Sequence, residues 1–258
     1  GSTQPISNLD LSPDGNRIAI LNKKYIRIWD LEQQKNIVSI PTHLNYVYSV
    51  RFSPDGKYVA YGSPRNDIII SDVAKGDEVY RLKGDQRIIN TIAFSPDNKL
   101  LASGGDDSSL YVWDLATRKP IVILKKMRSP ANSMSFSSDG MLLAVAHYVP
   151  YISLFDAHSG TSIKQLNGTI GPIETVKFSK DDSRIYFDMK DSVIRYWDIV
   201  RDKFGPLTRM DMHGIRASII EPDKDLFISG GEYGNMIFQY GQSEQQKKSK
   251  PHTNNITS

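Results

Sequence analysis

A repeat of constant period constrains the fold of this chain more than any other sequence feature. The pair Trp113-Asp114 closes the clearest copy of the unit, Leu101–Leu115. The same position recurs every 42 residues, as Trp29-Asp30, Ser71-Asp72, Trp113-Asp114, Phe155-Asp156, Trp197-Asp198 and Gln239-Tyr240. Because a repeat copies one structural unit along the chain, its period indicates the fold class before any single residue does.

Each copy also carries a turn signal about 18 residues before its closing pair. In this turn a proline presets φ, and an aspartate followed by Gly or Asn completes the bend. The successive copies are Ser12-Pro13-Asp14, Ser53-Pro54-Asp55, Ser95-Pro96-Asp97, Ser137-Ser138-Asp139, Ser179-Lys180-Asp181 and Glu221-Pro222-Asp223. The turn predicts a strand on each side, such as Val47–Phe52 or Thr91–Phe94 before it.

The segment before each closing pair alternates between apolar and other residues, which predicts a strand with one consistently buried face. Its inward positions are Ile26/Ile28, Ile68/Ile70, Leu110/Val112, Ile152/Leu154, Ile194/Tyr196 and Met236/Phe238. A fourth short strand is expected at 36–40, 78–82, 120–124, 162–166 and, more weakly, 204–208. A lone sheet of this size cannot bury both faces, whereas radial stacking of sheets can. We therefore predict an all-β fold, a β-propeller of six four-stranded antiparallel blades over residues 5–250.

The unit resembles the WD repeat, in its Ser-Pro-Asp-Gly turn, its small-residue second strand and its apolar-x-apolar-Trp-Asp ending. The resemblance covers about residues 5–250 and implies a propeller used as an interaction scaffold, usually without catalysis. WD repeats often pair a histidine before the first strand with an aspartate in the hairpin turn. Here the aspartate is present as Asp107 and Asp191, the histidine as His43, and no repeat has both. We expect Asp107 and Asp191 to bond nearby backbone amides instead.

The residues after the sixth repeat leave two readings open. His252–Ile256 looks like the opening of another repeat, so residues 251–258 are either the start of a further blade or a tail. If they begin a further blade, the chain is part of a larger propeller protein. Otherwise six blades close, or nearly close, a ring by themselves. Gln242–Lys250 lacks apolar anchors, and we expect it at an edge or poorly ordered.

Composition narrows the function classes. The chain has no cysteine, which excludes thiolate zinc sites and cysteine nucleophiles. A net charge of +3, with Lys and Arg spread through every repeat, gives little support to nucleic-acid binding. Nucleophile-elbow, phosphate-loop and His-Glu-x-x-His motifs are absent, as is an apolar run of membrane-spanning length. We therefore expect no enzyme, no cofactor, no metal, no small-molecule substrate, no membrane contact and a cytoplasmic or nuclear location.

The aspartates after each closing position and the pair Asp106-Asp107 are better explained as turn residues that bond backbone amides than as metal ligands. Function in such a fold is expected in the loops on the propeller faces and at the channel mouth. The turn His147–Tyr151 replaces turn chemistry with aromatic residues and is the strongest candidate, although packing on a neighbouring loop explains it equally well. The predicted partner-binding residues are Tyr46, Arg65, Arg87, Arg128, His147, Tyr148, Tyr151, Lys190 and Tyr233.

Tyrosine and arginine are the residue types that dominate interface hot spots. The sequence thus favours a non-catalytic scaffold that binds a protein or peptide within a multi-protein complex. The basic residues in that set would suit an acidic peptide or a phosphopeptide, but a solvated rim is the better explanation of them. Two alternatives remain: a nucleic-acid-associated scaffold with a basic face, and a propeller enzyme with a metal site in the channel.

Overall fold

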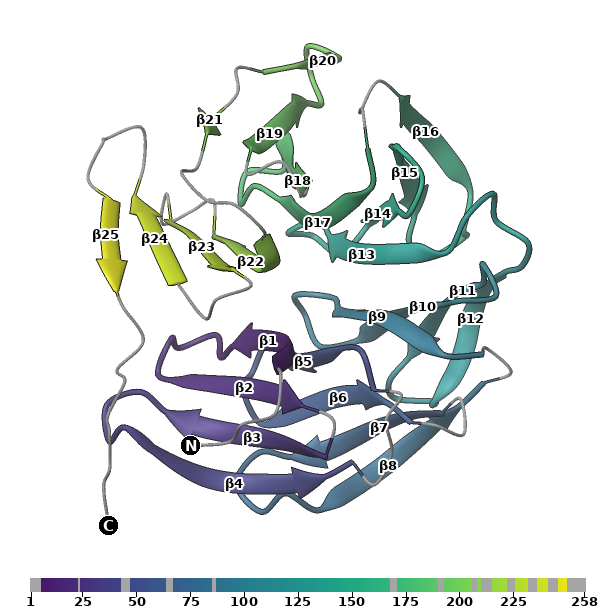
Figure 1. The fold of residues 1–258 in the computed structure, drawn as a ribbon. Helices are drawn as coiled ribbons and strands as arrows, with labels where there is room; N and C mark the ends of the chain where they lie inside the picture. Colours follow the sequence, from purple (N-terminus) through teal and green to yellow (C-terminus); the bar gives the residue numbers. More distant parts are fainter. Residues whose placement is uncertain are drawn as a thin grey trace.

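The computed structural model describes residues 6–22, 24–42, 47–63, 67–84, 87–167, 171–189, 193–205, 208–209, 215–221, 226–231, 236–240 and 246–249. All regular structure in these ranges is β, and six antiparallel sheets follow one another along the chain. Figure 1 shows them arranged around a common centre. The predicted all-β propeller architecture is confirmed, whereas residues 250–258 lie outside the described ranges.

Each sheet, or blade, is built from consecutive strands. Blade 1 contains β1 (Ile6–Leu11), β2 (Arg17–Asn22), β3 (Tyr25–Asp30) and β4 (Lys35–Pro41). Blade 2 contains β5 (Val50–Phe52), β6 (Tyr58–Gly62), β7 (Asp67–Asp72) and β8 (Glu78–Lys83). Blade 3 contains β9 (Ile89–Phe94), β10 (Leu100–Gly105), β11 (Leu110–Asp114) and β12 (Lys119–Leu124).

The remaining blades follow the same order. Blade 4 contains β13 (Ala131–Phe136), β14 (Leu142–His147), β15 (Tyr151–Asp156) and β16 (Ser162–Asn167). Blade 5 contains β17 (Ile173–Phe178), β18 (Arg184–Met189), β19 (Val193–Asp198), β20 (Lys203–Phe204) and β21 (Thr208–Arg209). Blade 6 contains β22 (Ile215–Glu221), β23 (Leu226–Gly231), β24 (Met236–Tyr240) and β25 (Gln246–Ser249).

The first strands of successive blades contact one another around the centre, and β22 also contacts β1. Each blade uses only its own strands, so no strand among the described residues joins the first sheet to the last. The strand β25 pairs only with β24 and lies at the outer end of its sheet, as expected for the polar segment Gln242–Lys250.

Two predicted strands differ from the observed ones. The strand predicted over Val47–Phe52 begins at Val50, because Val47 is buried in the core between blades 1 and 2 without joining the ladder. The fourth strand of blade 5, predicted over 204–208, is divided into β20 and β21. Gly205-Pro206 interrupts this segment, and proline has no amide hydrogen to donate to a ladder.

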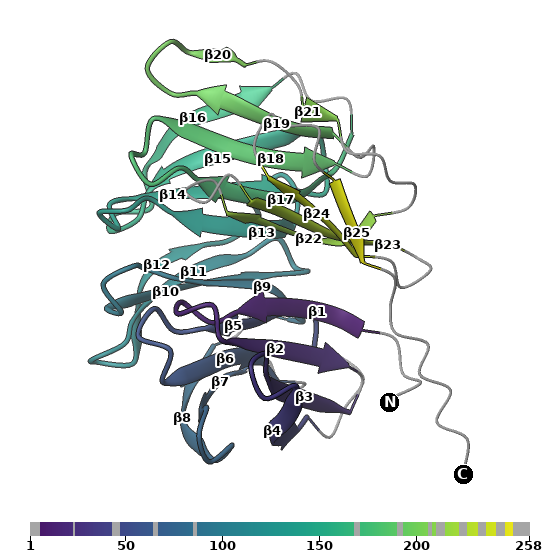
Figure 2. The same cartoon turned by 90° about the vertical axis from the view of Figure 1, so that its left-hand side faces the viewer.

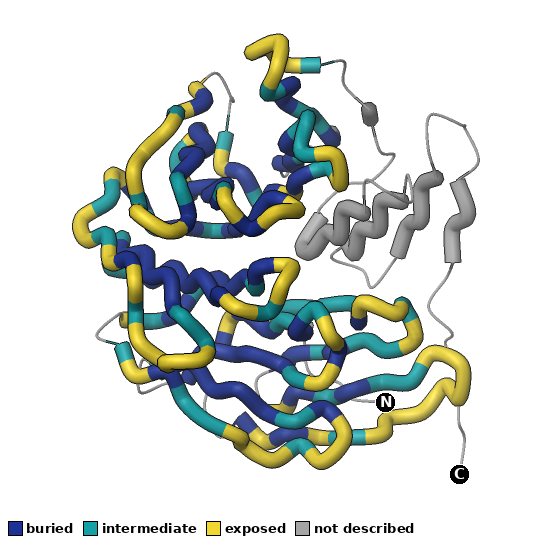
Figure 3. The backbone as a smooth tube through the Cα atoms, turned by 180° about the vertical axis from the view of Figure 1, so that it is seen from behind, coloured by how far each residue is buried: buried dark blue, intermediate teal, exposed yellow. Residues whose placement is uncertain are grey.

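The hydrophobic core lies between blades rather than within them. Four separate clusters of buried side chains each join two successive blades, from blades 1 and 2 to blades 4 and 5. In the cluster between blades 2 and 3, for example, Ile68 and Ile70 pack with Ile92 and Trp113. Figures 2 and 3 show these sheets stacked side by side, with exposed residues concentrated at turns and outer strands. Both faces of blades 2, 3 and 4 are therefore buried by their neighbours.

The serine and aspartate of the repeated turn form one local network. In blade 4, Ser137 Oγ donates to Asp139 Oδ1 at 2.6 Å and accepts from the Leu142 amide at 2.8 Å. Equivalent bonds occur in the turns that begin at Ser12, Ser53, Ser95 and Ser179. The network satisfies the buried serine and holds the entry to the second strand, so these residues are architectural.

A second contact repeats at the outer edge, where the turn after each third strand meets the fourth strand of the preceding blade. We call these four residue pairs the outer latches. Their members are Val38 with Gly76, Tyr80 with Arg118, Val122 with Gly160, and Lys164 with Asp202. The turn residue has positive φ in every case, between 53° and 79°. The chemistry of the pair nevertheless differs, from close apolar packing against glycine to an arginine over a tyrosine ring to an ion pair.

Candidate interaction surface

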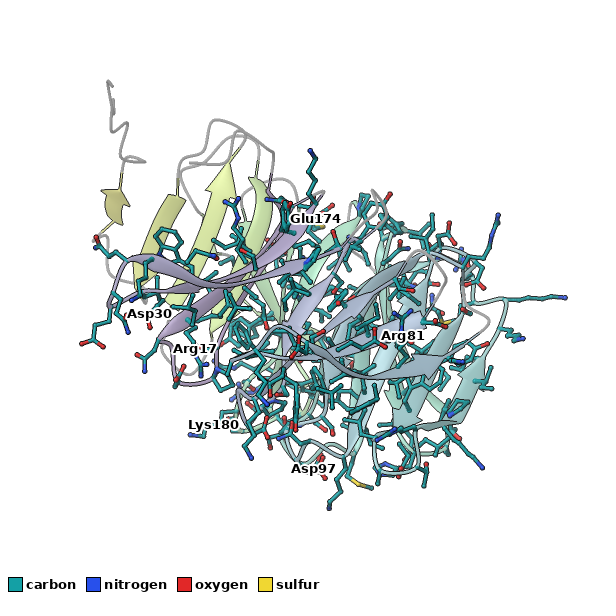
Figure 4. The ribbon with its side chains drawn as sticks, turned by 90° about the horizontal axis from the view of Figure 1, so that it is seen from below. Arg17, Asp30, Arg81, Asp97, Glu174 and Lys180 are labelled. Carbon is teal, nitrogen blue, oxygen red and sulfur yellow. The ribbon has the colours of Figure 1, made fainter. Side chains whose placement is uncertain are left out.

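The turn between β14 and β15 lies at the end of the blades opposite the Ser-Pro-Asp turns. Figure 4 gives the orientation: Glu174, near this turn, lies at one end of the molecule, and Asp97 and Lys180 lie at the other. His147 is the last residue of β14, and Tyr151 is the first residue of β15. Tyr148, Val149 and Pro150 form the exposed part of the connection.

His147 is buried and fully hydrogen-bonded. Its Nδ1 lies 3.1 Å from the Ser129 carbonyl oxygen, and its Nε2 lies 3.0 Å from Ser153 Oγ. Since a carbonyl can only accept, Nδ1 carries the proton in the neutral ring and Nε2 accepts from the serine. Burial lowers the pKa of His147 below its ordinary value of 6.5, and the bond to Ser129 opposes that shift. His147 therefore anchors the turn from beneath.

Tyr151 continues this buried base. Its ring stacks on the His147 ring with centroids 4.2 Å apart, and the Arg128 guanidinium lies over the Tyr151 ring, 5.7 Å from its centroid. Tyr151 is buried, whereas Arg128 is exposed. Arginine, tyrosine and histidine thus form one layered cluster that joins the loop before β13 to the turn after β14.

Tyr148 projects from this base and is 47% exposed. Desolvation raises the pKa of its hydroxyl, with smaller contributions in the same direction from Glu174, Tyr48 and Asp106. These groups belong to blades 5, 2 and 3, so they converge on Tyr148 from separate repeats. Tyr48 is 45% exposed. The result is a surface that combines two accessible aromatic rings with two carboxylates.

The structure brings together four of the predicted site residues: Arg128, His147, Tyr148 and Tyr151. Arg87 is exposed in the segment before β9. The other predicted residues, Tyr46, Arg65, Lys190 and Tyr233, lie outside the described residues.

Sequence reasoning missed Tyr48, Asp106 and Glu174. Tyr48 and Glu174 share one repeat phase with Asn90 and Asn132, and Asp106 shares the phase of Tyr148. Aligning the repeats therefore offered a signal, since polar or aromatic residues fill most of these positions.

The channel is hollowed at the Ser-Pro-Asp end. A cavity of about 400 Å³ there is lined by the first strands of blades 1 to 5, including Asp10, Arg51 and Lys177. Some of these first strands are joined through side chains. Asp10 Oδ2 accepts from the Phe52 amide at 2.7 Å, and Ser135 Oγ accepts from the Phe178 amide at 3.1 Å. These bonds satisfy amides at the inner sheet edge, which would otherwise lack partners.

The repeated aspartates have structural roles. Asp30 Oδ1 and Asp114 Oδ1 each accept from a backbone amide three residues later at 2.7 Å, and Asp72, Asp156 and Asp198 cap the same turn. Asp107 Oδ1 accepts from the Ser109 amide at 3.1 Å, which confirms the predicted local bonding, whereas Asp191 lies outside the described residues. Within the described ranges, no group of three or more His, Asp or Glu side chains is arranged to hold a metal ion.

The tryptophan of the closing pair in blade 3 makes a buried polar contact. Trp113 Nε1 donates to Ser103 Oγ at 2.9 Å, and both residues are fully buried.

The described part of the chain contains no helix long and apolar enough to cross a membrane.

Comparison with known proteins matches this architecture to one family. The model of the IFT122 first β-propeller matches residues 5–258, nearly the whole chain. The chain belongs to the family of the IFT122 first β-propeller. It is thus a WD-repeat β-propeller, as the repeat pattern indicated.

More local similarity occurs in three fungal proteins named hir1. The chain is 35% identical to protein hir1 of Emericella nidulans over 68 residues and 35% identical to protein hir1 of Aspergillus terreus over 69 residues. It is 34% identical to protein HIR1 of Aspergillus oryzae over 71 residues. Each match covers 22% of this chain and 7% of the relative.

Proposed function

We propose that this propeller is a non-catalytic scaffold that binds a protein or peptide partner through the surface around Tyr148. One observation carries the proposal: Tyr148 is displayed on a base that is fully bonded and buried. His147 and Tyr151 hold the turn, so the tyrosine can contact a partner at a small cost in conformational entropy.

The surroundings of Tyr148 suit polar recognition. Asp106 and Glu174 approach it from two blades, and Arg128 flanks the cluster on another side. Exposed tyrosine and arginine at one site are typical of interface hot spots. Membership of a propeller family of the scaffold type supports the same conclusion. The partner would belong to a multi-protein complex in the cytoplasm or the nucleus.

The test is quantitative affinity capture with the full chain as bait. Proteins retained by the wild type should be lost with Tyr148→Ala and weakened with Arg128→Ala. A matched control is Met141→Ala: Met141 is 48% exposed in the same blade but lies in the Ser-Pro-Asp-type turn at the opposite end. If Tyr148→Ala and Met141→Ala retain the same proteins as wild type, the named surface is wrong.

A further inference from the structure

The outer strand of blade 3 exposes apolar side chains that the propeller architecture does not require. Ile121 is 45% exposed and Ile123 is 49% exposed, and both lie on β12. Lys119 and Lys125, also exposed, precede and follow them at alternate positions. We name Lys119, Ile121, Ile123 and Lys125 the blade 3 strip.

The equivalent positions in the other blades show which of these exposed side chains are common to the repeat. The residue at the Ile121 phase is aliphatic in every one of the first four blades, and each time it lies at an irregularity in the ladder to the third strand. It is Ile37 in blade 1, Val79 in blade 2 and Ile163 in blade 4. Exposure at this phase is therefore common to the repeat.

The Ile123 phase behaves differently. It is polar in the neighbouring blades, as Ser39, Arg81 and Gln165. In blade 2, Arg81 is also occupied by ion pairs with Glu78 and Asp67. Only in blade 3, among these four, do two exposed isoleucines at alternate positions lie between lysines. Exposed apolar side chains on an edge strand are a template for pairing with another chain.

The backbone of β12 also favours binding of another chain. β12 is the terminal strand of its sheet, so one of its edges is paired with β11 and the other faces outward. Pro120 and the ladder irregularity beside Ile121 protect the first half of this edge, since both interrupt regular pairing. From Val122 to Leu124 the register is regular and continuous. This half can accept an added strand.

We infer that β12 is a second binding surface, for an extended segment of a partner protein that carries aliphatic residues flanked by acidic ones. The segment lies beside β12 and bonds to the edge at Val122–Leu124. Its aliphatic side chains pack on Ile121 and Ile123 as cross-strand neighbours. Its carboxylates lie near Lys119 and Lys125, which set the charge preference. This surface is at the outer edge of blade 3 and is separate from the one around Tyr148.

The experiment is selection of displayed random peptides on the full chain, followed by binding measurements with the enriched peptides. The peptides should carry two aliphatic residues at alternate positions with acidic residues on both sides. Their affinity should fall by at least about tenfold in the double variant Ile121→Ser/Ile123→Ser. It should also weaken with added salt. Hydrogen exchange at the amides of Val122–Leu124 should slow when peptide is bound.

Three further variants make the result decisive. Ile163→Ser removes an exposed isoleucine at the same phase in blade 4 and should leave peptide binding unchanged. Tyr148→Ala should also leave it unchanged, which separates this surface from the proposed scaffold site. Lys119→Glu/Lys125→Glu should reverse the selection toward basic peptides. The inference is overturned if no peptide depends on Ile121 and Ile123, or if the charge reversal does not alter the selected sequences.

Discussion

Asp182, in the turn of blade 5, binds Ser138, in the equivalent turn of blade 4. Its carboxylate accepts from the Ser138 amide at 2.8 Å and 3.0 Å and from Ser138 Oγ at 2.6 Å. The three preceding repeats have proline at the Ser138 phase, as Pro13, Pro54 and Pro96. Proline has no amide hydrogen, so the exchange to serine introduces a donor, and Asp182 supplies its acceptor.

This relationship predicts coupling between the two positions. The pair Ser138→Pro/Asp182→Gly recreates the proline–glycine contact of Pro13 with Gly56 and should be close to wild type in stability. Asp182→Gly alone loses the bonds to Ser138, and Ser138→Pro alone removes both donors. A double-mutant cycle by urea unfolding should therefore give a coupling energy of about 1 kcal/mol. Additive effects of the two substitutions would show that the contact contributes nothing.

Alanine substitutions at Gly160 and Gly15 distinguish the cost of steric contact from the cost of backbone strain. Both have positive φ, 72° and 75°, but a Cβ at Gly160 would lie 2.5 Å from Val122 Cγ1, whereas none of the described atoms lies within 4 Å of one at Gly15. Gly15→Ala should cost about 1 to 2 kcal/mol from strain alone. Gly160→Ala should cost about 1 to 3 kcal/mol more, because the outer latch to blade 3 is overpacked.

Urea unfolding of the two glycine variants measures this difference directly. Equal losses of stability would mean that blade 3 moves aside freely and that the outer latch at Val122 is not tightly packed.

The repeated turns predict loss of stability in acid. Bonds from Ser179 and Ser183 lower the pKa of Asp181 from 3.8 to about 2, and bonds led by Ser12 and Ser137 lower those of Asp14 and Asp139. The unfolded chain then binds more protons than the folded one between about pH 4 and pH 2. The stabilisation is present above the unfolded pKa and is lost as pH falls through the folded pKa.

The corresponding measurement is the pKa of Asp181 by carboxyl-carbon NMR. In Ser179→Ala/Ser183→Ala it should move up toward 3.8. The acid-induced decrease in the melting temperature should become smaller in the same variant. An unchanged pKa would contradict the assigned cause.

His147 predicts a second pH dependence at milder acidity. Burial depresses its folded pKa below the ordinary 6.5, so the unfolded state takes up a proton first as pH falls. The stability attributable to neutral His147 is full above about pH 6.5 and decreases below it, down to the folded pKa.

His147→Phe keeps a ring against Tyr151 but cannot titrate. This variant should be less stable overall, because Ser153 and Ser129 lose a hydrogen-bond partner. Its free energy of unfolding should nevertheless no longer decrease as the pH falls below the ordinary pKa of 6.5. Urea unfolding over a pH series tests this, and an unaltered slope would assign the titration to another group.

The period of the repeat was sufficient to predict the blades, because each strand pattern was supported by its copies. Ile28, Ile70 and Val112 are buried as their alternation required. Local spacing also identified the bonding of Asp107, since both partners lie within the same turn.

The candidate site was less predictable because its contacts cross between loops. The partner of His147, the Ser129 carbonyl, lies 18 residues away in another loop. Aromatic residues in a turn suggested a surface, yet His147 and Tyr151 are buried, whereas Tyr148 and Pro150 between them are exposed. The groups that influence the pKa of Tyr148 come from three other blades, a relationship that no single stretch of sequence contains.

The outer latches have a consequence for folding. A chain of near-identical units risks docking a blade against the wrong neighbour, as repeat and multidomain proteins do when they misassemble. Because Tyr80 fits Arg118 whereas Lys164 fits Asp202, a mispaired blade would meet a partner of unsuitable size or charge. Two of the four junctions, Tyr80–Arg118 and Lys164–Asp202, therefore have side-chain pairs of their own, whereas Val38–Gly76 and Val122–Gly160 share one chemistry. Side chains at the perimeter thus distinguish the junctions of blades 2 and 3 and of blades 4 and 5 from the others.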